Sequence, residues 1–265
     1  MMTVHDPEAL SSFYEQAYTS APEDAELYSR WRALGAVGKA DHVIELCARG
    51  GLAPSTVLDV GCGDGALLDE LSRRGFGGTL SGLELSSAAV AIARGRPGLE
   101  RVEQFDGTHV PSGDDEYDLG VLSHVLEHVP DPPSLLAEVA RACRAVVIEV
   151  PLERNASARR ASKRAHAEEI GHLTELDRGG ARGIVTAAGL EVAGELEDPL
   201  PLEVHLFFAR GRPARARGRL KWALRSGLHR LAPPLARRSF TLHYAALCLP
   251  PGAPRRSAAA TARTP

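Results

Sequence analysis

The stretch VLDVGCGDGALLDEL, Val57 to Leu71, ends an apolar run in a single acid, Asp59, and then alternates glycine with other residues. This order is typical of a buried strand that leads through a glycine loop into a helix. Such a loop presents free backbone N–H groups and the positive end of the helix to a ligand. Glycine lets the backbone approach closely because it has no Cβ atom. The usual ligand is part of a nucleotide, so the stretch predicts a nucleoside cofactor site.

Outward from this loop, short apolar runs alternate with helix-length amphipathic segments. The runs are TVLDV (56–60), TLSGLEL (79–85), RVEQF (101–105), YDLGVLSHV (117–125), AVVIEV (145–150), LEVAGEL (190–196) and SFTLHYAALCL (239–249). Strands separated by amphipathic segments of about 10–15 residues predict βαβ units and a parallel sheet. Apolar residues throughout these strands indicate burial on both faces of the sheet.

The chain has 265 residues, 44% of them hydrophobic and 25% charged, which is enough for one large core. We therefore expect one domain with additions. The expected parts are a helical lead-in or lid over 1–50, the main domain over 51–250 with insertions at about 152–174 and 200–238, and a disordered tail over 251–265.

Composition favours a cytoplasmic protein. The first residues lack a basic leader followed by an apolar segment, and no apolar run approaches the roughly 18 residues that a membrane span needs. The four cysteines, Cys47, Cys62, Cys143 and Cys248, have no paired spacing. We therefore expect neither a disulfide framework nor a metal site.

Charge is divided unevenly along the chain. Up to Glu203 there are 18 basic against 34 acidic residues, a net charge of −16, whereas Val204 to Pro265 carries 13 basic residues and no acid. Within the basic segment 210–238, leucines recur at helical spacing beside arginines. The segment could cap the substrate pocket, lie on a membrane surface, bind nucleic acid or simply face solvent. Of these, nucleic acid is the least favoured partner.

The glycines also match the dinucleotide pattern G-x-G-x-x-A through Gly61, Gly63 and Ala66, with an acid, Glu84, about twenty residues on. This keeps an NAD-type oxidoreductase open as an alternative of another reaction class. After Val150 little chain remains for a second catalytic domain, which disfavours it.

Several segments together resemble the class I S-adenosylmethionine-dependent methyltransferases, and in particular the type 11 and related small-molecule group. The resemblance rests on VLDVGCGDG, SGLELS, EQFDGTHVP, DLGVLSHVLEHVPDP and GHLTELDRGGARGIVTAAGLEV, in this order. It covers roughly residues 40–197. It implies an α/β fold with a Rossmann-like, mostly parallel seven-stranded sheet, helices on both faces and one antiparallel strand.

The resemblance also implies which residues contact S-adenosylmethionine and its product S-adenosylhomocysteine. They are Asp59, Gly61, Cys62, Gly63, Gly65, Glu84, Leu85, Asp106, Gly107 and Ser123. Glu84 would accept hydrogen bonds from the ribose hydroxyls and Asp106 from the adenine amino group, while Asp59 would steady the loop or the ammonium group. Each acid could instead cap a helix or face water, and Cys62 could simply fill a tight loop.

The resemblance implies methyl transfer to a small molecule, and we expect oxygen as the acceptor atom. A sugar, a lipid-linked or membrane-associated intermediate, a polyketide-like scaffold and a quinone-type ring all stay open as acceptors. A hydroxyl acceptor usually needs a base, and histidine suits that role near neutral pH. The candidates are His124, His172 and His128, with weaker claims for His205 and His243. A non-catalytic cofactor-binding protein is a further alternative.

Two other features have competing interpretations. Asp131-Pro132-Pro133-Ser134 is similar to the loop of base-methylating enzymes, but it lacks the aromatic residue that would stack on a flipped base, so we interpret Asp131 as a helix N-cap. Tyr14, Tyr18 and Trp31 could close over the cofactor or the acceptor, but at helical spacing we favour a role in core packing.

Overall fold

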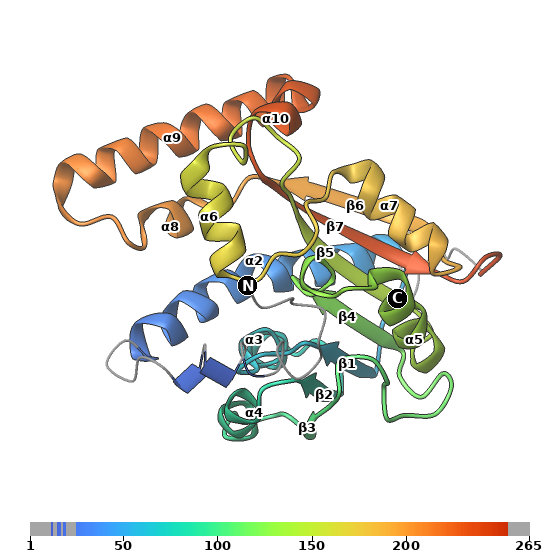
Figure 1. Ribbon diagram of the computed structural model, residues 1–265. Coiled ribbons are helices and arrows are strands. Elements are labelled where there is room, and N and C mark those ends of the chain that lie inside the picture. The colour runs from blue at the N-terminus through green and yellow to red at the C-terminus, as the bar shows by residue number, and fades with distance from the viewer. Residues whose placement is uncertain (1–11, 13–14, 17, 20–24, 254–265) are drawn as a thin grey trace, which may run out of the picture.

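The computed structural model describes residues 12, 15–16, 18–19 and 25–253 (Figure 1). Its centre is a seven-stranded sheet in the order β3-β2-β1-β4-β5-β7-β6. The strands are β1 Thr56–Val60, β2 Thr79–Glu84, β3 Arg101–Gln104, β4 Leu119–Ser123, β5 Val146–Leu152, β6 Glu191–Asp198 and β7 Leu242–Leu249. Only β7 runs antiparallel to its neighbours. The predicted Rossmann-like sheet is confirmed.

Helices cover both faces of this sheet and bury two separate cores. The helices are α2 Ala25–Arg49, α3 Ala66–Arg73, α4 Ser87–Arg94, α5 Pro132–Ala142, α6 Ala161–Glu169, α7 Arg178–Ala187, α8 Leu202–Leu206, α9 Gly211–Leu231 and α10 Pro233–Ser239, with a 3-10 turn, η2, at Leu126–His128. Residues of α2, α3 and α4 pack on one face, and residues of α5 and α7 on the other. The helix expected in the lead-in therefore contributes Val43 and Leu46 to the core itself.

The parallel strands bring several acids to one edge of the sheet. Asp59, Glu84 and Glu149 lie at or near the carboxyl ends of β1, β2 and β5, and all three side chains are buried. The strand order reverses between β1 and β4, which is where open α/β sheets bind ligands. The fold thus places a polar crevice beside the glycine loop.

Side chains cap several helices, and the sequence predicted one of these caps. Asp131 caps α5: its carboxylate accepts a hydrogen bond from the Ser134 backbone N–H at 3.3 Å, and proline occupies the first turn. Asp177 caps α7 in the same way. The interpretation of Asp131 as an N-cap is confirmed, which accounts for the Asp-Pro-Pro segment without any base-methylating role.

The basic segment forms α9, which packs against α8 and α10 and extends away from the sheet (Figure 1). None of its residues is buried, and Leu220 and Leu224 are 61% and 66% exposed. Within the part of the chain that the structure describes, no helix is both long enough and apolar enough to cross a membrane.

Candidate functional site

A cavity of about 860 Å³ opens at the carboxyl edge of the sheet. Its walls come from the glycine loop, the ends of β1, β2, β4 and β5, the start of β7, and parts of α2, α6 and α8. Cavities of this size are typical of sites for small molecules and cofactors.

The glycine loop brings backbone to the cavity wall in a conformation that other residues rarely adopt. Gly61 has a φ of 77°, and a Cβ atom added there would lie 2.5 Å from Val125 Cγ2. Gly63 has a φ of 56°, and its Cβ would lie 2.7 Å from the Tyr18 hydroxyl. The predicted glycines therefore form a cradle that any side chain would fill.

Glu84 links the glycine loop to β2. Its carboxylate accepts hydrogen bonds from the backbone N–H of Gly63 at 2.9 Å and of Ser86 at 3.0 Å. Burial raises the pKa of Glu84, although these backbone donors oppose the rise. The carboxylate lines the cavity, so it both shapes the loop and faces whatever the loop binds.

The other two predicted acids differ in their surroundings. Asp59 is 3% exposed, and burial raises its pKa to about 7. Asp106 is exposed, and hydrogen bonds from the backbone of His109 and Thr108 lower its pKa. Both line the cavity. Thr108, through its backbone N–H and its hydroxyl, and the His109 backbone N–H all donate to one oxygen of Asp106, Oδ1. The capping role that the sequence left open therefore uses only half of this carboxylate.

Most of the remaining predicted cofactor residues also line the cavity, namely Cys62, Leu85, Gly107 and Ser123. Gly65 does not: it precedes α3, and a Cβ atom there would meet Ala93, Arg96 and Leu99 instead. Cys62 is buried against Gly82, as the packing interpretation expects, and burial raises its pKa well above the ordinary value.

The three predicted histidines all line the same cavity. His124 follows β4 with a φ of 59°, and its Nδ1 lies 3.2 Å from Glu127 Oε1. His172 Nδ1 lies 2.6 Å from Glu153 Oε2, and its ring packs edge-on against His128 with 4.7 Å between centroids. Burial and the neighbouring His172 lower the pKa of His128, although Glu127 opposes this. The general-base roles stay predictions.

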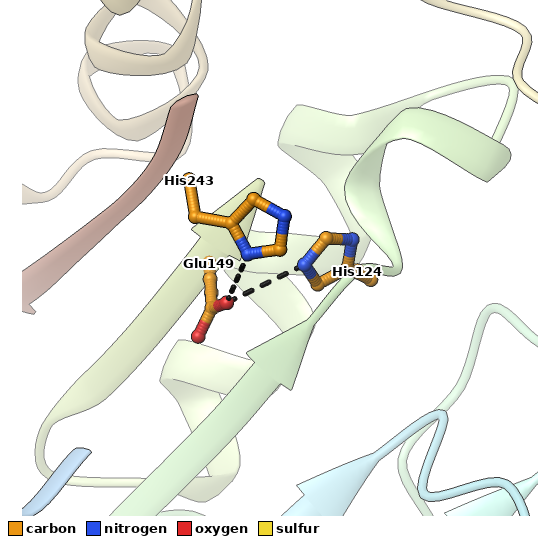
Figure 2. Close-up of side chains that lie close together, drawn as sticks. All are labelled: His124, Glu149 and His243. Atoms are coloured by element: carbon orange, nitrogen blue, oxygen red, sulfur yellow. Dashed lines mark hydrogen bonds and ion pairs between the residues drawn. The ribbon is translucent and has the colours of Figure 1, made fainter. Parts of the chain in front are cut away.

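Sequence analysis missed a polar cluster beside them. Glu149, 2% exposed, has His243 Nδ1 at 3.2 Å and His124 Nε2 at 3.4 Å from its Oε1 (Figure 2). His42 Nδ1 lies 3.3 Å from its other oxygen, and His42 Nε2 lies 3.3 Å from Asp198 Oδ2. A single acid inside the apolar run AVVIEV, like Asp59 in TVLDV, was the available signal for Glu149.

Aromatic residues of the lead-in form another part of the wall. Tyr18 and Trp31 line the cavity, so neither serves core packing alone, as sequence analysis had favoured. Trp31 packs against Phe207 and Phe208 after α8. Arg32 stacks over the Tyr18 ring at 4.9 Å and donates to Asp64 at 2.8 Å. Tyr14 lies outside the described residues.

The basic insertion contributes only its first part to the cavity. Leu200, Pro201, Val204 and Phe208 line it, whereas no residue of α9 does. The segment around α8 therefore forms part of the cavity wall, whereas α9 does not, and the pocket-capping role stays a prediction.

An α/β sheet with a glycine loop, a strand-end acid and a crevice at its switch point defines a nucleoside-cofactor protein. Residues 29–194 match the family model of the methyltransferase domain, and the chain belongs to this family.

Several curated relatives are named as O-methyltransferases. "Ubiquinone biosynthesis O-methyltransferase" from Acinetobacter baumannii is 35% identical over 37% of this chain and 41% of the relative. The protein of the same name from Hydrogenovibrio crunogenus is 30% identical over 52% of this chain and 57% of the relative. The chain thus spans about half the length of the curated relatives it matches.

Solved structures share the fold. Geranyl diphosphate C-methyltransferase from Streptomyces coelicolor A3(2), in complex with Mg²⁺, geranyl diphosphate and S-adenosylhomocysteine, has a TM-score of 0.55 at 14% identity over 80% of this chain and 76% of that one. The cyclase SpnF has a TM-score of 0.54 at 18% identity over 80% of each chain. At these identities the similarity defines the fold and leaves the reaction to the site.

Proposed function

We propose that this protein transfers a methyl group from S-adenosylmethionine to an oxygen atom of a small-molecule acceptor. The observation that carries the proposal is the glycine cradle at Gly61 and Gly63, closed from one side by the buried carboxylate of Glu84. Family membership and the naming of relatives as O-methyltransferases support it.

The charges around the cavity fit this cofactor better than a dinucleotide. When bound, S-adenosylmethionine supplies a methyl group on a positively charged sulfur. The acids Asp59, Glu84 and Asp106 all line the cavity. Carboxylates favour a cation, whereas they repel the pyrophosphate of NAD. The acid-lined cavity therefore disfavours the oxidoreductase alternative.

Each acid has a role that its surroundings allow. Glu84 already accepts backbone N–H bonds, and a carboxylate has further lone pairs with which to accept the two ribose hydroxyls. Asp106 uses Oδ1 for its own turn and leaves Oδ2 for an amino group. Asp59 can stabilise a nearby positive charge, and such a charge in turn keeps its carboxyl group ionised, whereas burial raises its pKa in the free protein.

Among the histidines, we assign the general base to His172. Its Nδ1 faces Glu153 Oε2 at 2.6 Å, which fixes the ring and leaves Nε2 for the acceptor proton. His124 is less suited to this role: burial lowers its pKa, but the carboxylates of Glu127 and Glu149 outweigh burial and raise it, which favours the protonated ring.

A quinone-type or lipid-linked acceptor is the preferred subclass, because the relatives are named for ubiquinone biosynthesis.

We also propose that α9 rests on an anionic membrane surface. Leu220 and Leu224 are largely exposed, lie one turn apart and are surrounded by arginines such as Arg217 and Arg219. The site would then work at the cytoplasmic face, where a reducing environment suits the free, buried cysteines.

The reaction is tested by incubating the protein with labelled S-adenosylmethionine and an extract of its source cells, which is then separated into lipid, polar, RNA and protein fractions. Label in the lipid or small polar fraction, absent with Glu84→Ala, is expected. Label confined to RNA or protein, or none with wild type, would contradict the proposal.

The membrane surface is tested separately by flotation with anionic vesicles. The Leu220→Asp/Leu224→Asp double variant should lose most of the binding, whereas Ile92→Asp, at an exposed position on α4, should keep it. Equal binding by both variants would refute a role for α9. High salt should weaken the wild-type interaction, because part of it is electrostatic.

A further inference from the structure

The cluster around Glu149 joins three neighbouring strands. Glu149 lies within β5, His124 directly follows β4, and His243 lies in β7, where it pairs with Pro151 of β5 (Figure 2). The His124 backbone N–H donates to the Glu149 carbonyl at 2.8 Å, which fixes the spacing between these two residues. The three side chains therefore meet on rigid backbone and all line the cavity.

Two buried carboxylates give this cluster a preference for positive charge. Glu149 and Glu127 are 2% and 0% exposed, and His124 lies between them, with Nδ1 at 3.2 Å from Glu127 and Nε2 at 3.4 Å from Glu149. Burying carboxylates is costly unless positive charge compensates them. The His124 Nε2 atom is itself buried, and its contact with Glu149 is an ion pair without the geometry of a hydrogen bond.

We propose that His124 Nε2, Glu149 Oε1 and His243 Nδ1 bind one divalent transition-metal ion of the zinc class. These atoms lie within 4.8 Å of one another. The two distances to Glu149, 3.4 and 3.2 Å, match the edge of about 3.4 Å expected between ligands placed about 2.1 Å from a tetrahedral ion. Two imidazoles and one carboxylate favour zinc, cobalt or iron over magnesium, which prefers oxygen ligands.

The groups around these ligands have the arrangement that metal sites use. Glu127 faces Nδ1 of His124, so it can hold the proton there and leave the Nε2 lone pair for the ion. His42 faces the second oxygen of Glu149 at 3.3 Å and is itself held by Asp198.

The remaining coordination position would open toward the cavity that all three ligands line. The ligand class that fits it is a hydroxyl or phenolate oxygen. That identification rests on the proposed function, because it makes the acceptor oxygen a metal ligand. The metal site itself, in contrast, depends only on the cluster.

A second group, Glu127, His128 and His172, offers ligand atoms within the same 4.8 Å limit. The variants below distinguish the two groups, because His243 belongs only to the first and His172 only to the second.

The experiment uses full-length protein dialysed against a chelator and then titrated with Co²⁺, followed by its visible absorption, and with Zn²⁺, followed by calorimetry. One ion per chain is expected. His243→Ala and Glu149→Gln should each weaken binding by at least about 100-fold, and His42→Ala by about 10- to 100-fold. His229→Ala, which removes an imidazole from α9 outside the cavity, should bind as wild type does.

Binding should weaken as the pH falls, because protons compete for the same imidazoles. Titration of each variant with S-adenosylmethionine checks that the fold persists, and it separates the two proposals. Cofactor binding without metal binding by wild type would overturn the metal site alone. Metal binding that survives in both His243→Ala and Glu149→Gln, or that is lost in His172→Ala and kept in His243→Ala, would also overturn it.

Discussion

The two halves of the cavity are built differently. On the side of β1 and β2, backbone makes the site: Gly61 and Gly63 leave space, and Glu84 holds their loop. On the side of β4, β5 and β7, side chains make it, because histidines surround the buried carboxylates Glu127 and Glu149. The first half suits a fixed cofactor, whereas the second can exchange protons or a cation. Substitutions in the two halves should therefore differ in what they change.

The largest effect is expected from crowding the backbone half. Gly61→Ala places a Cβ atom 2.5 Å from Val125 at a φ of 77°, so the loop must shift, and affinity for S-adenosylmethionine should fall by about 100-fold or more. Gly75→Ala is the matched control, since its φ is also positive but its Cβ would meet open space. Calorimetry should give wild-type affinity for Gly75→Ala. A similar loss of affinity in both variants would mean that backbone strain, and not the contact with Val125, causes the loss.

The side-chain half should respond mainly in stability. Glu127→Gln leaves His124 without one of its carboxylate partners, and we expect a loss of about 3 kcal/mol in the free energy of unfolding at pH 7. Burial acts to raise the pKa of Glu127, but His124 lowers it to about 2.

A depressed carboxyl pKa stabilises the fold above its unfolded value and loses this effect as the pH falls through the folded value. Wild type should therefore lose stability between about pH 4.5 and pH 2, and Glu127→Gln should lose less there. Denaturant titrations at several pH values measure this, with the exposed Glu100→Gln as control. Parallel pH profiles for wild type and Glu127→Gln would contradict the ion pair.

Asp59 should show the opposite sign. Burial raises its pKa to about 7, while Lys39 lowers and Glu84 raises it. Between about pH 4 and pH 7 the unfolded chain ionises first, so this group makes wild type less stable as the pH rises. Asp59→Asn should gain on the order of 4 kcal/mol at pH 8 in the free protein and should bind the cofactor more weakly. Unchanged stability at pH 8 would contradict a buried Asp59 carboxyl group with a raised pKa.

The smallest effect is expected outside both halves. Asp131→Ala removes the N-cap of α5 and should lower the free energy of unfolding by about 1 kcal/mol, with methyl transfer unchanged. Asp131→Asn, which keeps a capping side chain, should be nearly neutral in thermal melts. A loss of activity in Asp131→Asn with normal stability would revive a catalytic role for the Asp-Pro-Pro segment.

The contrast between the halves also explains what the sequence could predict. Asp59, Gly61 and Glu84 lie in short local patterns that predict strand ends and a glycine loop. The fold and this side of the cavity wall could therefore be predicted from the sequence. Glu149 and His243 meet only through the pairing of β5 with β7, and no local pattern encodes that register. Gly65 follows the same glycine pattern but faces α4, because the helix turns away from the cavity there.

The basic segment was ambiguous for a related reason. Its leucine spacing predicted a helix, and α9 confirms one. The same spacing cannot define which surface the helix rests on. The position of α9 depends on the preceding helix, α8. Phe207 and Phe208, which follow α8, pack against Trp31, a residue far away in the sequence.

The most direct test of the central claim is calorimetric titration of purified protein with S-adenosylmethionine and, separately, with NAD, for wild type and Glu84→Ala. We expect wild type to bind one S-adenosylmethionine per chain and to give no heat with NAD, and Glu84→Ala to lose most of that affinity. Binding of NAD in place of S-adenosylmethionine, or binding that ignores the loss of Glu84, would contradict the account.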